Sequence, residues 1–128
     1  MVLSSGGLTV NGTFIGASDR NVKAGFEPVD PRVILEKVAV LPITRWHYTN
    51  NAATPYLGHV AQDFYAAFNV GPDDRHIATV DESGVALAAI QGLNQKVETE
   101  SAALRTENAV MKRRLEALEE IIRNQKPN

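Results

Sequence analysis

A heptad repeat runs through residues 85–123, VALAAIQGLNQKVETESAALRTENAVMKRRLEALEEIIR. One position of the repeat, which we name d, is apolar five times in succession. It is occupied by Ile90, Val97, Leu104, Met111 and Leu118. The a position is polar in three layers and then apolar in two: Asn94, Ser101, Asn108, Leu115 and Ile122. This pattern predicts a long C-terminal coiled-coil helix whose polar layers set the register.

The charges beside this seam fit a second copy of the helix that runs in the same direction. Each g residue faces an opposite charge at the e position five residues later. The pairs are Glu100 with Arg105, Glu107 with Lys112, and Arg114 with Glu119. A single amphipathic helix packed on its own domain is the alternative, but a helix of roughly 60 Å is too long for the upstream residues to cover. We therefore expect a parallel homo-oligomer with this interface: Ile90, Val97, Leu104, Asn108, Met111, Leu115, Leu118 and Ile122.

Composition limits the other functions that the chain can have. Its 128 residues, 44% of them hydrophobic, allow one modest domain in addition to the coiled coil. The net charge is −2, and no basic run precedes the heptads as it does in a leucine-zipper transcription factor, so we expect no nucleic-acid partner. The chain has no cysteine, which excludes disulfides and thiolate chemistry. We find neither a signal peptide in residues 1–7 nor a membrane-spanning stretch, and expect no membrane partner.

The first third of the chain predicts a hairpin and a helix. Residues 8–10 (LTV) and 13–15 (TFI) are β-type runs on either side of Asn11 and Gly12, a dipeptide favoured in tight hairpin turns. Asp30 followed by Pro31 is a typical helix start, and an apolar stripe then continues as far as Leu41. We predict a helix of two to three turns there.

The middle of the chain predicts further short elements. Residues 43–48 alternate as in a strand with one aromatic face, and residues 50–55 are interpreted as a loop. From Gly58 onward, apolar residues at helical spacing predict a helix that ends at residues 69–72. Residues 77–80 are interpreted as a brief strand. The predicted fold class is α+β, a small mixed domain of short strands and helices followed by the long helix.

Ser18 and Lys23 are the candidate catalytic residues. A hydroxyl and an amine form a complete nucleophile and base pair if the amine is neutral, which requires desolvation or a nearby cation. Five residues of extended strand would separate the two Cα atoms by roughly 16 Å, so the segment must turn or the lysine must come from another subunit. A polar surface loop explains the same residues. Asp19 can shape the turn or orient the lysine, and we favour the turn.

The other polar residues indicate no second site. The three histidines, at positions 47, 59 and 76, show no ligand-type spacing, so we expect no metal. The acidic pairs at residues 73–74 and 81–82 lie in turn-like sequence and are interpreted as solvated carboxylates.

Four blocks in order resemble the C-terminal intramolecular chaperone of endosialidase-type phage tail spikes. The same module is similar to one in other phage tail fibres and in the myelin regulatory factor. The blocks are Ser18 and Asp19 with Lys23, residues 46–48 (WHY), residues 58–64 (GHVAQDF) and residues 84–91 (GVALAAIQ). The resemblance runs from about Ala17 to the end of the heptads.

The resemblance implies a homotrimeric, self-cleaving serine peptidase without a cofactor. Ser18 would be the nucleophile and Lys23 the general base, with cleavage between Ala17 and Ser18. Residues 1–17 would be the end of a β-rich passenger, residues 18–83 the chaperone and peptidase domain, and residues 84–128 the trimerisation helix. Release would follow folding of a tail spike or fibre in the host cytoplasm, with the passenger entering the virion tail. The alternatives are a non-catalytic trimerisation cap and a coiled-coil adaptor.

Overall fold

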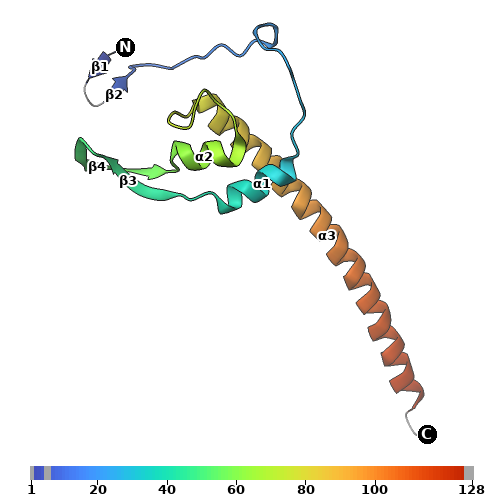
Figure 1. Ribbon diagram of the computed structural model, residues 1–128. Coiled ribbons are helices and arrows are strands. Elements are labelled where there is room, and N and C mark those ends of the chain that lie inside the picture. The colour runs from blue at the N-terminus through green and yellow to red at the C-terminus, as the bar shows by residue number, and fades with distance from the viewer. Residues whose placement is uncertain (1, 5–6, 126–128) are drawn as a thin grey trace. The chain divides into compact units, whose positions relative to one another are not determined.

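The computed structural model describes residues 2–4 and 7–125, which divide into two compact units. One unit combines the residues before Asp30 with residues 41–77. The other combines residues 30–40 with those from Ala78 onward. The chain is a small mixed protein of α-helices and short antiparallel strands with a long C-terminal helix, as the predicted fold class requires (Figure 1).

The second unit is built on the predicted long helix, α3, which spans Thr79–Asn124 (Figure 1). Its 46 residues correspond to about 70 Å of helix. The helix begins earlier than predicted, so the interpretation of residues 77–80 as a strand is wrong. Asp81 and Glu82 lie in its first turn, where negative charge favours a helix start.

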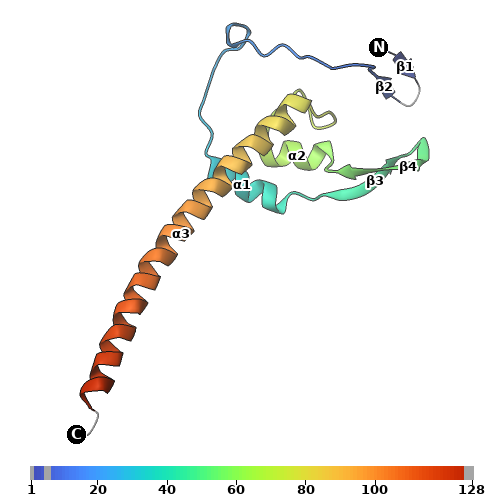
Figure 2. The same cartoon turned by 180° about the vertical axis from the view of Figure 1, so that it is seen from behind.

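The predicted helix after Asp30 is confirmed as α1, Pro31–Val40, and it packs against α3 (Figures 1 and 2). The carboxylate of Asp30 accepts a hydrogen bond from the backbone N–H of Arg32 at 2.9 Å, which satisfies a donor at the helix start. Proline at the first helical position needs no such partner. Gly92 allows the close approach, because a Cβ there would lie 2.1 Å from the carbonyl oxygen of Pro31.

The face of α3 that carries α1 is not the seam of the heptads. The buried residues of α3 are Ala88, Ala89 and Gly92, at heptad positions b, c and f. These positions lie opposite a and d on a helix that follows the heptad register. α1 therefore leaves the predicted seam uncovered.

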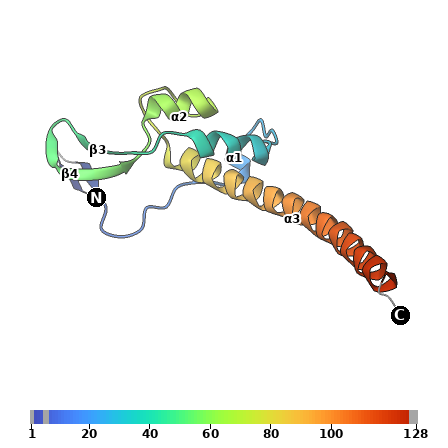
Figure 3. The ribbon, with the colours of Figure 1, turned by 90° about the horizontal axis from the view of Figure 1, so that it is seen from below.

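In the first unit, β3 (Thr44–Tyr48) and β4 (Asn51–Gly58) form a two-stranded antiparallel sheet (Figure 3). Strand β3 confirms the prediction for residues 43–48. The interpretation of residues 50–55 as a loop is wrong, because only Thr49 and Asn50 form the turn and β4 starts at the next residue. Pro55 is accommodated because a two-stranded sheet has an open edge on each strand.

The predicted helix after Gly58 is confirmed as α2, Ala61–Phe68. It ends at Asn69, which adopts the left-handed conformation with φ 49° and whose N–H donates to the carbonyl of Tyr65. Phe64, only 3% exposed, stacks on the ring of His59 and contacts the ring of Phe68. These rings form the small apolar centre of the unit.

The prediction of a hairpin over residues 8–15 is wrong, because the N-terminal hairpin is formed by residues 2–4 and 7–9. Strand β1 (Val2–Ser4) pairs with β2 (Gly7–Thr9), so residues 13–15 form no strand. A type I′ turn at Asn11 and Gly12 needs positive φ at both residues, whereas only Gly12 has it. The residues between β1 and β2 lie outside the described ranges.

Candidate active site

Ser18 and Lys23 meet in the first unit. The Lys23 Nζ atom lies 2.6 Å from the Ser18 Oγ atom, within hydrogen-bond distance. The two residues are five apart in sequence, so this contact requires the turn that an extended segment lacks. A hydroxyl held against an amine is the arrangement in which the amine can remove the hydroxyl proton.

A short 3-10 helix, η1 (Arg20–Val22), makes the turn between them. Asp19 begins it, and the Asp19 carboxylate accepts hydrogen bonds from the backbone N–H of Asn21 at 2.9 Å and from its side-chain amide at 3.1 Å. The backbone N–H of Lys23 donates to the carbonyl of Arg20 at 3.2 Å. Lys23 then returns to extended backbone. These contacts give Asp19 the turn-forming position that we favoured from the sequence.

The serine–lysine pair is open to solvent in a single chain. Every residue from 7 to 29 is exposed, including Ala17 on the N-terminal side of the serine. Apolar side chains close in sequence to the pair are also largely exposed: Phe14 is 81% exposed, Ile15 86% and Phe26 67%. The serine hydroxyl and the lysine amine are within hydrogen-bond distance, but the isolated chain does not supply a dry environment around them.

The three histidines take separate local partners. Nδ1 of His47 is 3.0 Å from the carbonyl oxygen of Tyr48, and His59 stacks on Phe64. His76 contacts the Asp73 carboxylate at 2.9 Å. Within the described ranges, no group of three or more His, Cys, Asp or Glu residues could hold a metal ion.

The environment of Asp73 lowers the pKa of its carboxyl group. Its carboxylate accepts hydrogen bonds from the backbone N–H groups of Arg75 and His76. The bond from Arg75, followed by the contact with the His76 ring, lowers the pKa of Asp73 below its ordinary value of 3.8. This carboxylate organises an exposed loop.

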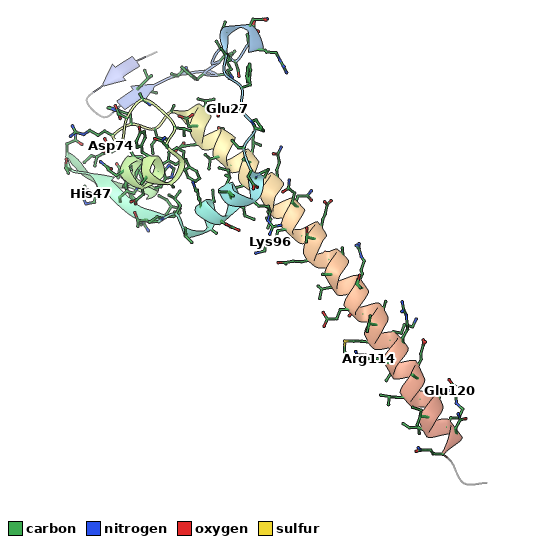
Figure 4. The ribbon with its side chains drawn as sticks, turned by 45° about the vertical axis from the view of Figure 1, so that its right-hand side comes forward. Glu27, His47, Asp74, Lys96, Arg114 and Glu120 are labelled. Carbon is green, nitrogen blue, oxygen red and sulfur yellow. The ribbon has the colours of Figure 1, made fainter. Side chains whose placement is uncertain are left out.

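All eight predicted interface residues are exposed to solvent in the single chain. They are Ile90, Val97, Leu104, Asn108, Met111, Leu115, Leu118 and Ile122. A surface groove of about 420 Å³ follows the apolar end of the seam beside Met111, Leu115 and Leu118. Figure 4 shows Lys96, Arg114 and Glu120 projecting outward from successive points along α3. Over the described residues 93–125 of this helix, no residue is buried.

Sequence reasoning missed two structural positions, Tyr56 and Gly92. Asn21 is a turn residue by type, and the structure adds that it holds the turn by donating twice to Asp19. Tyr56 stacks on Trp46 at 5.1 Å, but its strand was interpreted as a loop. Gly92 gave no signal, because a glycine inside a heptad repeat does not reveal what packs on it.

One region of the chain matches a known protein family. Residues 18–71 match the family model described as chaperone of endosialidase, which is classed as a peptidase family. The match begins at Ser18 and contains Lys23 and the β3–β4 hairpin. No curated protein and no solved structure matches the chain. Together with the sequence blocks that fall inside it, this match supports an endosialidase-chaperone domain over residues 18–71 of the chain.

Proposed function

We propose that this chain is an intramolecular chaperone that trimerises, assists the folding of an upstream β-rich phage tail spike or fibre, and then cleaves itself off between Ala17 and Ser18. The family match supports the chaperone role and association with an upstream passenger. Its peptidase class supports self-cleavage. The chaperone acts in the host cytoplasm during phage assembly, and the passenger becomes part of the virion tail.

The contact of 2.6 Å between Ser18 Oγ and Lys23 Nζ is the observation that carries the proposed chemistry. A neutral Lys23 amine takes the proton of the Ser18 hydroxyl, and Oγ adds to the carbonyl carbon of Ala17. The Ala17–Ser18 C–N bond breaks as the Ser18 nitrogen receives the proton, which leaves an ester on Oγ. Water hydrolyses this ester to the Ala17 carboxylate and restores the hydroxyl.

Because the serine–lysine pair is exposed in a single chain, cleavage can depend on assembly. A lysine amine becomes neutral near pH 7 when it is removed from water or placed beside another cation. A single chain leaves this segment exposed, so neighbouring chains or the passenger must cover it. Cleavage would then follow correct assembly, and loss of the chaperone would make the assembled passenger kinetically hard to unfold.

The uncovered seam of α3 supports assembly through this helix. Leu104 is 57% exposed, Met111 59% and Leu118 56%, although a monomeric protein normally avoids a long apolar stripe in water. Because α1 occupies the opposite face, parallel copies can join along the seam without displacing it. Trimerisation is the state that the family resemblance implies.

The mass of individual denatured chains after purification tests the proposal. We expect a main species beginning at Ser18, and intact chains for Ser18→Ala and Lys23→Ala. Ser83→Ala and Lys37→Ala are matched controls, because both residues are exposed and lie outside the segment. A Ser18→Ala chain still cut after Ala17 would exclude this serine as the nucleophile.

A non-catalytic trimerisation cap is the second candidate, and the exposed seam favours it independently of the serine. It predicts a stable oligomer of intact wild-type chains with no effect of Ser18→Ala on mass. A coiled-coil adaptor predicts instead that α3 assembles with a foreign helix in preference to itself. Sedimentation of the wild-type protein alone distinguishes these two.

A further inference from the structure

We infer that Asp19 and Asn21 are positioning residues for the serine–lysine pair, acting by fixing the turn that returns Lys23 to Ser18. The inference rests on the proposed function and adds to it the residues on which the geometry of the pair depends. Neither residue is given a proton-transfer role. Both act through the path of the backbone.

The two hydrogen bonds to Asp19 close the first step of the turn. One Asp19 carboxylate oxygen accepts both the backbone N–H and the side-chain amide of Asn21. In the same turn, the carbonyl of Asp19 accepts a hydrogen bond from the backbone N–H of Val22 at 3.2 Å. An aspartate whose side chain accepts the N–H two residues on is a recognised way to start a turn.

The second step brings the lysine back toward the serine. The N–H of Lys23 donates to the carbonyl of Arg20, and Lys23 itself is extended at φ −119° and ψ 152°. The Nζ atom then lies 2.6 Å from Oγ instead of pointing away along a strand. The distance between base and nucleophile therefore depends on a turn of only three helical residues.

Local hydrogen bonds are the main support for this turn in the single chain. All residues of η1 are exposed, and none of them packs in an apolar centre. A 3-10 turn of this length is weak by itself, since few hydrogen bonds offset the loss of backbone freedom. Removing the Asp19 acceptor should therefore reduce the fraction of chains in which the pair is formed.

If Asp19 instead acted on Lys23 through its charge, removing that charge would favour cleavage. A carboxylate near a lysine favours the protonated amine, which cannot serve as a base. If Asp19 acted by charge, Asp19→Asn would shift the pH dependence of cleavage to lower pH. If Asp19 acts by shaping the turn, Asp19→Asn keeps an oxygen acceptor at the same place and leaves the pH dependence unchanged.

The test is the first-order rate of self-cleavage, followed on labelled chains from a brief pulse of cell-free synthesis at several pH values. We expect Asp19→Ala to slow cleavage by about tenfold, the loss typical of a removed helix cap. Asn21→Ala loses only the side-chain bond and should slow it about threefold, a smaller share of the same cap. Asp19→Asn should restore most of the rate with the wild-type pH profile. Glu27→Ala, an exposed carboxylate beyond the turn, is the control.

The oligomeric state of each variant, in a Ser18→Ala background that cannot cleave, separates a local effect from failed assembly. If the Asp19→Ala chain cleaves at the wild-type rate, the inference is overturned while the proposed function stands. An Asp19→Asn chain that cleaves with a profile shifted to lower pH replaces the turn role with a charge role. Intact wild-type chains, or cleavage in Ser18→Ala, remove the proposed function and the inference together.

Discussion

At Gly92, the helices α1 and α3 approach each other closely. A Cβ at this position would lie 2.1 Å from the Pro31 carbonyl oxygen and 3.0 Å from the Leu35 Cβ atom. Backbone oxygen cannot move aside as a flexible side chain does, so Gly92→Ala should separate the helices. We expect a loss of about 1–3 kcal/mol in the free energy of unfolding, measured by urea denaturation at fixed protein concentration.

Gly84 provides the matched control in the same helix. Apart from the neighbouring backbone of the helix itself, no atom lies within 4 Å of a Cβ built there, so Gly84→Ala should only improve helix propensity. The expected change is a gain of up to about 1 kcal/mol. Equal effects of the two alanines would contradict the close contact between α1 and α3.

Asp73 gives a prediction about protonation. The bond from the Arg75 N–H and the contact with His76 lower its pKa, so the carboxylate stabilises its loop at pH values above 3.8. That contribution is lost as the pH falls through the lowered pKa. His76→Ala should raise the pKa of Asp73 toward 3.8 without fully restoring it, because the Arg75 bond remains. Carboxyl NMR titration measures this, with His47→Ala as a control that should leave the value unchanged.

The residues of the candidate site were visible in the sequence, but their contact was not. Ser18 and Lys23 were candidates because of their chemistry, although a polar loop was the more common explanation of a serine and a lysine this close in sequence. What brings them together is a pair of hydrogen bonds from Asn21 to Asp19, local but dependent on side-chain geometry. Residue identity and spacing do not specify such geometry.

At the scale of elements, the β3–β4 hairpin depends on its aromatic face. Trp46 and Tyr56 are direct partners across the strands, with ring centroids 5.1 Å apart and planes at 21°. A double-mutant cycle of Trp46→Leu and Tyr56→Leu should give a coupling of about 0.5–1.5 kcal/mol in the free energy of unfolding. The pair Arg45 and Leu57, the neighbouring partners, serves as control and should couple weakly. A coupling near zero for the aromatic pair would mean that the rings do not stabilise the hairpin together.

Elements with a strong local pattern were predicted well. α1, α2 and α3 each have an apolar stripe at helical spacing, and α1 and α2 also have clear boundary residues. The wrong predictions lie in segments whose sequence pattern suits two kinds of secondary structure. The turn-type residues of 50–55 lie mostly in β4, because pairing with β3 outweighs the propensities of Asn and Pro. The short apolar run at 77–80 suits a strand or a helix start equally.

At the scale of the whole molecule, one chain buries little. The buried apolar residues among those described are Phe64, Ala88 and Ala89. A protein of this length normally encloses a larger core. The described helices include none with the length and apolar character to cross a bilayer. In the proposed trimer, association between copies would bury further apolar side chains.

Asn108 tests whether the polar a layers lie inside the proposed seam. A polar residue at an a position fixes register at a cost in stability, so Asn108→Ile should raise the thermal stability of the oligomer in a Ser18→Ala background. The gain should be on the order of 1 kcal/mol per chain, part of what full burial of an isoleucine contributes. Gln95→Ile at an outer position of the same helix is the control and should give no gain. Equal effects of the two would place Asn108 outside an interface.

The link between assembly and cleavage is tested with charges in the seam. Leu104→Asp with Met111→Asp puts two carboxylates per chain at d, where parallel copies would bury them, so the oligomer should dissociate. Without neighbours to cover the exposed Lys23, cleavage after Ala17 should cease as well. Ala103→Asp with Val110→Asp places the same charges one residue away on the outer face, and both oligomer and cleavage should persist. Sedimentation and chain mass on the same samples decide the matter, because efficient cutting by a monomer would refute the gate while leaving the serine–lysine chemistry in place.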